Sequence, residues 1–476
     1  MSEVLSSDST IKFRLDSFEI LKKSFHANQN PSLKERKEGL VRLKNNIINF
    51  KKEILSAFEL DFKKPAFEVE ASEILVCIRE INLTLKNINY WAQDKPMDTD
   101  ILLVGTHNYI KFEPKGVVLI ISPWNYPLLL AVLPLISAYA AGNKIVLKPS
   151  EFSPNVSQVI QKIIALSFKA EEVVCFLGGA DLGSELVSMP FNHIFFTGSK
   201  KVARKILSLT AHNLTPVTLE LGGKSPAIVD VNYDMGLAVE RIAHAKILNA
   251  GQTCIAPDFV WIHRSKVQEF VVLWQLKLKE WFGSNMTDHP NYCGLIHENH
   301  FNRILAIVDA SISEGAELAE EMEINSNFLK IKPTLLLNSK FDHTSMQDEI
   351  FGPLLPIIAY DDLESEIHLL QSMDRPLSLY IFSNTKSLVK NLLNNLRSGG
   401  VTWNNCLVNF CASNLPFGGD HQSGKGFTHG YYGFLEFSHQ RAIAKQGILP
   451  STLKLFYPPY TTLKKKLLNR LIKYFS

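Results

Sequence analysis

Short apolar runs alternate with polar turns and helix-length segments through the middle of the chain. The predicted strands of this region are 117–121, 144–148, 173–176 and 193–197. The predicted helices between them are 128–141, 154–165 and 181–187. Such alternation is typical of a parallel α/β sheet. Ligands bind at the carboxyl ends of parallel strands, so the loops at Asn125, Lys148, Gly178 and Gly198 are predicted to border a binding site.

A second α/β segment follows the first along the chain. Its predicted strands are 217–221, 227–229, 259–263, 354–360 and 399–404. Its predicted helices are 235–248, 266–282 and 299–314. Residues up to about Gln93 carry apolar positions at helical spacing, and 101–112 alternates like a hairpin arm that leaves the domain.

One apolar stretch is long enough to cross a bilayer, because residues 116–142 contain no charged side chain. Pro123, Asn125 and Pro127 lie close together within it, and Pro134 follows. A lipid-exposed helix does not accommodate two prolines and an amide so close together. The pattern instead predicts a buried strand, a loop and a buried helix.

Composition places the chain among globular, intracellular proteins. Its 476 residues predict two or three domains, and a net charge of +3 gives no support for nucleic-acid binding. None of the six cysteines forms a C-x-x-C pair, so we expect neither a disulfide framework nor a metal site. The first ten residues are polar with no apolar segment typical of a secretory signal, and a cytoplasmic location is expected.

The candidate nucleophile is Cys254, in the turn Gly251-Gln252-Thr253-Cys254. A cysteine on a tight turn exposes its sulfur and aims its own N–H at the group that the sulfur attacks. The alternative is a buried cysteine that acts as a small hydrophobe, and a single cysteine does not decide between them.

Four other polar residues would make chemical sense around Cys254. Asn125 is a candidate donor to an alkoxide, and loss of such a donor costs on the order of 10²–10³ in rate. Glu220, before a Gly-Gly pair, is a candidate base for water, and Lys148 and Glu349 can bond ribose hydroxyls. The alternatives are a helix cap for Asn125 and solvated surface positions for the other three.

Two nucleotide-binding motifs are absent from the sequence. No G-x-G-x-x-G follows a predicted strand, and the two partial matches to a phosphate-binding loop, ending at Lys425 and Lys224, each lack a required residue. Neither an ordinary Rossmann dehydrogenase nor a nucleoside triphosphatase is indicated.

Seven motifs occur in the order typical of the aldehyde dehydrogenase superfamily, which the chain resembles from about residue 15 to residue 445. They are Pro123-Trp124-Asn125-Tyr126-Pro127, Lys148-Pro149-Ser150-Glu151, Phe196-Thr197-Gly198-Ser199, Glu220-Leu221-Gly222-Gly223-Lys224, Gly251-Gln252-Thr253-Cys254, Glu349-Ile350-Phe351-Gly352-Pro353 and Pro416-Phe417-Gly418-Gly419. The Pro-Trp-Asn-Tyr-Pro form and the short N-terminus look like the class 3 branch, which includes fatty and aromatic aldehyde dehydrogenases.

The resemblance implies a role for each matching residue. Cys254 would be the nucleophile, Glu220 the base for deacylation and Asn125 the oxyanion donor. The residues implied at the NAD site, with NADP possible, are Trp124, Lys148, Glu151, Gly198, Ser199, Leu221, Glu349 and Phe351. Those implied at the aldehyde channel are Tyr126 and Phe417.

The resemblance also implies the architecture: an aldehyde dehydrogenase-like α/β fold with two parallel-sheet domains and a small β arm that forms a homodimer. The cofactor domain would be 1–94 with 115–218, and the catalytic domain 219–427. The arm would be 95–114 with 428–446, followed by a basic amphipathic tail at 447–476.

Some positions depart from the family pattern. Lys200, Lys201 and Arg204 add cations near the expected cofactor phosphates, where they would favour NADP, whereas Glu151 would repel a 2′-phosphate. The alternative for the cations is a solvated helix face. Asp420 and His421 replace an apolar residue and a glycine, which puts the channel mouth in doubt.

The tail places its apolar side chains on one helical face. They are Leu463, Leu467, Leu468, Leu471, Ile472 and Phe475. Basic residues surround this face, so peripheral contact with an anionic membrane is one hypothesis, and docking on a partner subunit is the other.

The expected reaction is NAD(P)-dependent oxidation of hydrophobic aldehydes to acids, through a cysteine thiohemiacetal and a thioester that a Glu-activated water hydrolyses. A CoA-acylating enzyme is the first alternative, and it would not need Glu220. A non-catalytic cofactor-binding protein is the second, and it would need none of Cys254, Glu220 and Asn125.

Overall fold

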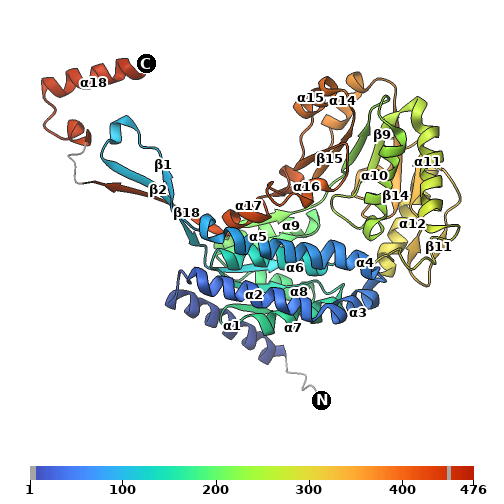
Figure 1. Ribbon diagram of the computed structural model, residues 1–476, viewed down its shortest axis with the longest axis horizontal. Coiled ribbons are helices and arrows are strands. Elements are labelled where there is room, and N and C mark those ends of the chain that lie inside the picture. The colour runs from blue at the N-terminus through green and yellow to red at the C-terminus, as the bar shows by residue number, and fades with distance from the viewer. Residues whose placement is uncertain (1–6, 448–451) are drawn as a thin grey trace.

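The computed structural model describes residues 7–447 and 452–476. The first six residues, part of the segment predicted to lack a secretory signal, and residues 448–451 of the predicted tail lie outside this description. Two α/β lobes lie side by side, and a narrow β arm projects from them with the C-terminal helix near its tip (Figure 1).

The first sheet has six strands in the order β17-β7-β6-β3-β4-β5. The strands are β3 (Val117–Ile121), β4 (Lys144–Lys148), β5 (Val173–Cys175), β6 (His193–Thr197), β7 (Val217–Glu220) and β17 (Gly424–Lys425). Five of them run parallel, and only the short β17 pairs antiparallel, with β7. The predicted parallel α/β sheet is confirmed.

Helices cover both faces of this sheet, as the near-continuous apolar strands require. They are α1 (Ser7–Ala27), α6 (Pro127–Ala140), α7 (Pro154–Ser167), α8 (Ala180–Val187) and α9 (Lys200–Thr210). Val117 and Leu119 of β3 pack into the cluster that holds Phe18 of α1, whereas Val118 and Ile120 pack into the larger core. The alternation follows from the two-residue period of a strand.

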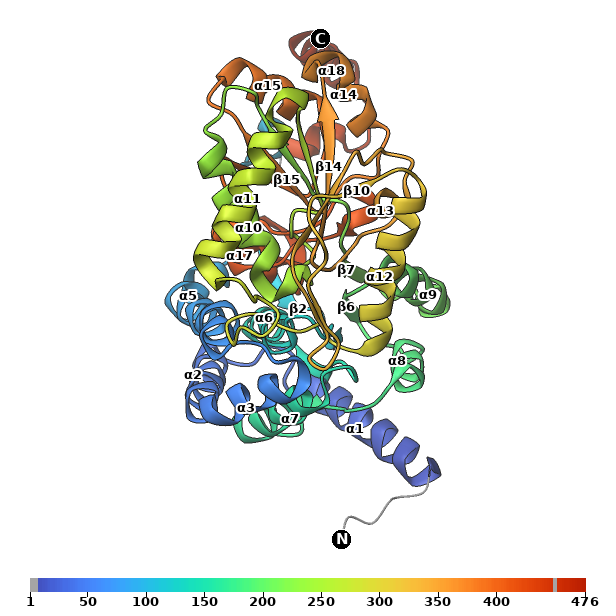
Figure 2. The same cartoon turned by 90° about the vertical axis from the view of Figure 1, so that its right-hand side faces the viewer.

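The second sheet has seven strands in the order β10-β13-β14-β9-β8-β15-β16. The strands are β8 (Pro226–Val229), β9 (Phe259–His263), β10 (Glu317–Leu318), β13 (Thr334–Leu337), β14 (Leu354–Tyr360), β15 (Ser378–Phe382) and β16 (Gly400–Trp403). The helices of this lobe are α10 (Met235–Ile247), α11 (Val267–Phe282), α12 (Glu298–Ser313), α13 (Thr344–Gln347), α14 (Leu363–Gln371) and α15 (Lys386–Asn395). Figure 2 shows α10–α12 lying over this sheet.

The predicted N-terminal helices pack against the first lobe. They are α2 (Leu33–Asn49), α3 (Lys51–Phe62), α4 (Ala66–Val69), the π-helical turn Glu70–Ile74 and α5 (Leu75–Trp91). Apolar residues of α2, α3 and α5 join the larger core together with those of α6.

The arm is a three-stranded antiparallel sheet in the order β1-β2-β18. Its strands are β1 (Lys95–Met97), β2 (Thr106–Pro114) and β18 (Ser438–Gln446). Helix α17 (Gly430–Glu436) comes before β18 and packs on α5 and α6 of the first lobe. Helix α18 (Thr462–Phe475) ends the chain. Within residues 7–447 and 452–476, every helix is too short or too polar to span a bilayer.

Sequence patterns missed or misplaced several elements. Residues 101–103 form a 3₁₀ turn rather than part of a strand, because Asp100 caps it by accepting from the Leu102 N–H at 2.8 Å. Strands β13 and β15 and helices α14 and α15 were not predicted. Their apolar runs are short, and strand and helix cannot be told apart by periodicity over so few residues.

A buried ion pair joins the N-terminal helices to α6. The Lys64 ammonium lies 3.0 Å from Glu73 Oε1, and both side chains are fully buried. The other Glu73 oxygen accepts from the backbone N–H groups of Leu128 and Leu129 at 3.1 and 3.0 Å, in the first turn of α6. One carboxylate therefore satisfies a buried cation and the start of a helix.

Replacing Glu73 by Leu removes the closest partner of Lys64 and the acceptor of α6. We expect the free energy of unfolding to fall by about 3 kcal/mol, because breaking a buried pair leaves an uncompensated charge. Urea denaturation followed by tryptophan fluorescence measures the change. The double variant Lys64→Met/Glu73→Leu should lose less than Glu73→Leu alone, and an equal loss in both would contradict the role assigned to the pair.

Candidate functional site

The turn that carries Cys254 has an unusual backbone. Asn249 and Ala250 adopt left-handed φ angles of 54° and 51°, and Gly251 follows at 73°. A Cβ on Gly251 would overlap the Gly352 carbonyl, so both the angle and the space require glycine here. The turn leaves Cys254 partly exposed while its neighbours are buried.

The side chain of Gln252 fixes this turn from inside. Its Nε2 donates to the carbonyls of Asn249 and Gly294 at 2.9 and 3.1 Å. Its Oε1 accepts from the Ile296 N–H at 3.0 Å. Both donor bonds and the acceptor bond of this amide are made to backbone groups. Gln252 therefore supports the turn and is not a group that contacts a ligand.

Asn125 lies directly against the same turn. Its Nδ2 donates to the Gln252 carbonyl at 3.1 Å, and its backbone carbonyl accepts from Asn249 Nδ2 at 2.8 Å. An amide nitrogen carries two hydrogens, and this bond uses one of them. Tyr126 adds a second link through its hydroxyl, 2.9 Å from Thr253 Oγ1. The structure thus brings Asn125 and Tyr126 to Cys254, and the helix-cap alternative for Asn125 is not observed.

Glu220 ends β7 and is buried with 5 % of its surface exposed. Neither carboxylate oxygen has a hydrogen-bond partner among the residues that the structure describes. Burial, and then the negative charge of Glu436, raise the pKa of Glu220 well above its ordinary value. The surface alternative is therefore excluded for this residue, and an unpaired buried carboxyl is the group expected at a reactive site.

The electrostatics of Cys254 tie the site together. Burial raises the pKa of its thiol, and the carboxylates of Glu349 and then Glu220 raise it further. Both carboxyl groups therefore lie within electrostatic reach of the sulfur. The thiol is protonated at neutral pH, so it needs a nearby proton acceptor before it can attack a substrate.

The carboxylate of Glu349 lies against Gly222 and acts on the thiol electrostatically. A Cβ on Gly222 would overlap its carboxylate, so the glycine after β7 makes room for it. Burial, and then the charge of Asp258, raise the pKa of Glu349 to about 8. Glu349 is only partly exposed, and its carboxylate packs against Gly222 instead of standing free in solvent.

Four side chains hold the backbone around Glu349. The Lys224 ammonium pairs with Asp258 and donates to the Asp348 carbonyl at 3.1 Å, while Asp258 Oδ1 accepts from the Ile350 N–H at 3.1 Å. Arg303 donates to the Ile350 carbonyl, and His300 Nε2 bonds the Phe351 carbonyl at 2.8 Å.

The ring of Phe351 lies edge-on to that of Trp124, with centroids 5.4 Å apart. The ring centroids of His300 and Trp124 are 5.7 Å apart. Phe351 has a left-handed φ of 54°, which a bulky residue rarely adopts, and the bonds around it maintain that conformation.

The remaining residues implied at a cofactor site lie at the carboxyl ends of the first sheet. Lys148 ends β4 and is almost fully buried, and its ammonium lies 2.9 Å from a Glu151 carboxylate oxygen. Gly198 follows β6 and donates its N–H to the Glu220 carbonyl at 3.0 Å, and Ser199 caps α9. Leu221 is buried beside them.

A cavity of about 710 Å³ has Cys254 in its wall. Apolar side chains dominate its lining, which comes from α4, α5, α6, α10 and residues 405–411. The apolar members are Pro65, Phe67, Ala71, Val76, Tyr126, Leu129, Leu130, Ile247, Leu248, Ile255, Leu407, Val408 and Phe410. Glu68 also lines the cavity.

Phe417 lies beside this cavity, in a cluster with Ile255 and Leu377 against which Cys254 packs. Its ring stacks on His429 at 5.2 Å. Asp420, one of the departures from the family pattern, pairs with Arg375 at 2.9 Å, and the neighbouring His421 has a left-handed φ of 57°.

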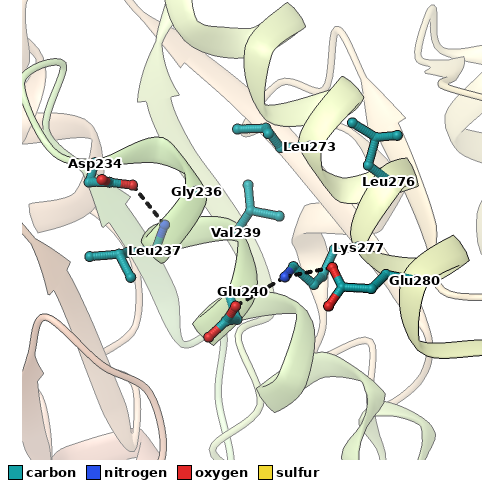
Figure 3. Close-up of a pocket in the computed structure, with 9 residues that line it drawn as sticks. All are labelled: Asp234, Gly236, Leu237, Val239, Glu240, Leu273, Leu276, Lys277 and Glu280. Atoms are coloured by element: carbon teal, nitrogen blue, oxygen red, sulfur yellow. Dashed lines mark hydrogen bonds and ion pairs between the residues drawn. The ribbon is translucent and has the colours of Figure 1, made fainter.

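A second hollow lies between α10 and α11, and Figure 3 shows its nine lining residues. Lys277 bridges Glu240 and Glu280 there, at 3.0 and 2.9 Å. None of the nine is a cysteine, serine, threonine or histidine, and the one lysine is held between two carboxylates. Within the described ranges no group of acidic, histidine and cysteine side chains is arranged to bind a metal.

Sequence patterns did not single out Asn249, His300, Arg303 or Glu68. His300 and Arg303 are three residues apart on α12, a spacing that places them on one helix face and was the available signal. Asn249 and Glu68 become visible only when the chain folds, because Glu68 lies 181 residues from the Asn249 N–H that it accepts at 2.8 Å.

The chain is similar in sequence to proteins of one family. The family model described as "Aldehyde dehydrogenase family" matches residues 17–443. The 4,4'-diaponeurosporen-aldehyde dehydrogenase of Staphylococcus aureus is 38% identical over 440 residues, 92% of this chain and 94% of that protein. Aldehyde dehydrogenase family 3 member A2 of Pongo abelii is 36% identical over 442 residues, 92% of this chain and 90% of that protein.

Solved structures agree. One described as the substrate-bound state of Staphylococcus aureus AldH has a TM-score of 0.92 at 36% identity, over 96% of this chain and 99% of that one. An indole-3-acetaldehyde dehydrogenase complexed with NAD⁺ has a TM-score of 0.82 at 26% identity, over 90% of this chain and 88% of that one. The chain therefore belongs to the aldehyde dehydrogenase family and is similar to its class 3 members.

Proposed function

We propose that this protein oxidises hydrophobic aldehydes, aliphatic of medium or long chain or aromatic, to carboxylic acids with NAD(P). The observation that carries the proposal is the apolar cavity with Cys254 in its wall and the unpaired Glu220 carboxyl within electrostatic reach of the thiol. Similar proteins are named for large apolar or aromatic aldehydes, diaponeurosporen-aldehyde and indole-3-acetaldehyde.

In this mechanism Cys254 attacks the aldehyde carbon and forms a thiohemiacetal. Negative charge develops on the former carbonyl oxygen, and the Nδ2 hydrogen of Asn125 that Gln252 does not use is one donor for it. The Cys254 backbone N–H is the second donor. Because Asn125 is bonded to the turn itself, donor and nucleophile keep one geometry.

Glu220 has two tasks in this mechanism. Burial that raises its pKa makes it a stronger base, and its oxygens have no competing donors. It first accepts the proton of the Cys254 thiol, and it releases this proton to solvent before deacylation begins. It later takes a proton from the water that hydrolyses the thioester, which supports release of an acid over transfer to coenzyme A and argues against a non-catalytic protein.

The strand ends of the first sheet fit a dinucleotide. Lys148 and Glu349 present an ammonium and a carboxylate suited to ribose hydroxyls, and the α9 N-terminus at Ser199 suits a phosphate. The space that Gly222 leaves for Glu349 supports the same assignment. Trp124, Gly198, Leu221 and Phe351 would border the ligand. When bound, the nicotinamide supplies the hydride acceptor.

NAD is the proposed preference over NADP. The Glu151 carboxylate already pairs with the Lys148 ammonium, and its negative charge would repel a 2′-phosphate. Lys200, one of the three cations that would favour NADP, pairs with Asp374 at 2.8 Å instead.

We also propose that the arm forms a homodimer. Strand β18 lies at the edge of the arm sheet, and most of its nine residues are exposed. Strand β16 lies at the edge of the second sheet and exposes Val401 and Trp403. Unpaired edges of this kind are sites at which another chain adds.

The third proposal is peripheral contact of α18 with an anionic membrane. The helix has five basic residues and no acidic one, and Leu463, Ile472 and Phe475 are more than half exposed. Each cation near an anionic surface contributes about 1 kcal/mol. Leu468, Leu471 and Ile472 also border a hollow with Leu102, so part of the apolar face turns to the arm.

A panel of aldehydes tests the proposed reaction. With increasing aliphatic chain length, and with benzaldehyde and cinnamaldehyde types, KM should fall about tenfold per two methylenes until the cavity is full, because each buried CH₂ contributes about 0.8 kcal/mol. NADH and NADPH absorbance reports turnover and cofactor preference. Cys254→Ala should give none, while Cys77→Ala, a buried thiol of α5, should retain it. Preference for short polar aldehydes, or for NADP, would contradict the assignments.

Replacing Glu220 by Gln should slow both acylation and deacylation, because the variant lacks the base for the thiol and for water. Wild-type turnover should rise with pH through the raised pKa of Glu220, since only the ionised carboxyl accepts a proton from water. The variant should show at most one equivalent of NADH per subunit, lose this pH limb and turn over about 10²–10⁴-fold more slowly. Stopped-flow absorbance measures both phases. Steady turnover at the wild-type rate would refute the base.

Vesicle co-sedimentation tests the tail. Full-length protein should pellet with phosphatidylserine vesicles and not with phosphatidylcholine alone, and high salt should release it, because screening weakens the cation contribution. A version that ends at Pro459 should stay in the supernatant. Equal pelleting of the two forms would remove the membrane assignment and favour the subunit contact.

A further inference from the structure

Four side chains near Glu220 form a series of hydrogen bonds, here called the file. The series begins at Lys115 of the first lobe and ends at Glu436 of α17. Lys115 Nζ lies 3.2 Å from His193 Nδ1, and His193 Nε2 lies 2.9 Å from Thr218 Oγ1. The Thr218 hydroxyl in turn bonds Glu436 Oε1. The four side chains come from the turn before β3, from β6, from β7 and from α17.

The chemistry of the two ends fixes the direction of every bond. An ammonium only donates and a carboxylate only accepts. His193 Nδ1 therefore accepts from Lys115, which leaves the hydrogen on Nε2 to be donated to Thr218. The Thr218 hydroxyl then donates to Glu436. Burial and the adjacent Lys115 charge lower the pKa of His193, in agreement with this neutral tautomer.

Both oxygens of Glu436 accept hydrogen bonds that suit an anion. Oε1 accepts from Thr218, and Oε2 accepts from the Phe427 N–H at 3.3 Å. A Cβ on Gly426 would lie 2.9 Å from Oε1, so the chain passes close enough to confine the carboxylate. Glu436 is thereby held in one place by β7 and by residues 426–427.

This fixed carboxylate bonds the strand that bears Glu220. Thr218 and Glu220 are two residues apart on β7 and project from the same face of the sheet. Glu436 is the one charged group whose field raises the pKa of Glu220. Glu220 has no hydrogen bond that stabilises its own anion, whereas Glu436 has two.

We propose that Glu436 is a positioning residue for the reaction, whose fixed negative charge strengthens Glu220 as a base. The inference rests on the proposed role of Glu220. Two neighbouring carboxyl groups in different surroundings divide the tasks: the one with donors carries the permanent charge, and the one without donors exchanges the proton. The file from Lys115 keeps the charge on Glu436.

The charged and titratable groups that face this pair come from several elements. Lys115, His193 and Glu436 form the file, and the charges of Glu349 and Glu220 both act on Cys254. Lys115 is partly exposed, and the charge of Glu436 raises the pKa that burial lowers. Of these groups, His193 and Glu436 bond Thr218 on the strand that bears Glu220, and Glu436 is the one that carries negative charge.

Glu436→Gln tests the inference through the pH dependence of deacylation. A 4-nitrophenyl ester acylates Cys254 without any dinucleotide, and the steady release of nitrophenol after the burst follows hydrolysis of the acyl-enzyme. Without the like charge, the ascending limb of this rate should move down by about 0.5–1 pH unit. The rate on the high-pH plateau should fall severalfold, because the base is weaker.

Three further variants make the test specific. Glu436→Asp keeps the charge and should return the limb toward its wild-type position. Thr218→Val breaks the file, keeps both carboxyl groups and should shift the limb in the same direction by less, which covers the case in which Glu436→Gln does not fold. Glu80→Gln removes another buried carboxyl, one that accepts from Gly430 at the start of α17 at 2.7 Å, and should leave the profile unchanged.

The outcomes separate the two proposals. A wild-type protein without an acyl-enzyme or without an ascending limb would refute the role of Glu220 itself. If the wild-type protein has the ascending limb and neither Glu436→Gln nor Thr218→Val shifts it, only the assignment to Glu436 would be overturned. A shift of equal size in Glu80→Gln would also overturn it, because the effect would then belong to α17 as a whole.

Discussion

The bonds between the loop after β3 and the turn before Cys254 are the constraint on which the site depends. The side-chain amides of Asn125 and Asn249 both donate to the Gln252 carbonyl. The Asn249 amide also donates to the backbone carbonyl of Asn125. Asn125 follows a strand of the first sheet, whereas Cys254 belongs to the second lobe. The amides therefore set the distance between the two lobes beside Cys254.

Burial determines the proton chemistry of the site. The Cys254 thiol and the carboxyl groups of Glu220 and Glu349 all have raised pKa values, and in each case desolvation is the largest cause. Within the described residues, no cation lies close enough to Glu220 to lower its pKa. The protein thus places three acidic groups where burial disfavours their charged forms.

The sequence predicted the first sheet well, because its strands are apolar on both faces and separated by clear turn residues. Strand β3 and the start of α6 matched almost to the residue, since Pro127 suits a first helical position. Second-lobe elements such as β13 and β15 were missed because short apolar runs there lack a diagnostic period. The arm was placed by family resemblance, and no periodicity would have paired β18 with β2 across more than 300 residues.

For the site, motif order identified residues whose proximity local patterns cannot show. Asn125, Glu220 and Cys254 are distant in sequence, and each had an ordinary alternative until the fold gave its burial and partners. The supporting residues were harder to predict. Gln252 and Asn249 bond mainly to backbone atoms, and a side chain's choice of carbonyl depends on loop geometry that no composition or spacing encodes.

The left-handed run at Asn249, Ala250 and Gly251 has a consequence for how the site can vary. Three successive residues in that region reverse the chain within one turn, so Cys254 owes its place to main-chain torsion angles. Substitutions around the cavity can enlarge or reshape it without moving the sulfur. An insertion or deletion within the turn would instead rotate the sulfur away from Asn125, so the length of this segment limits how the site can change.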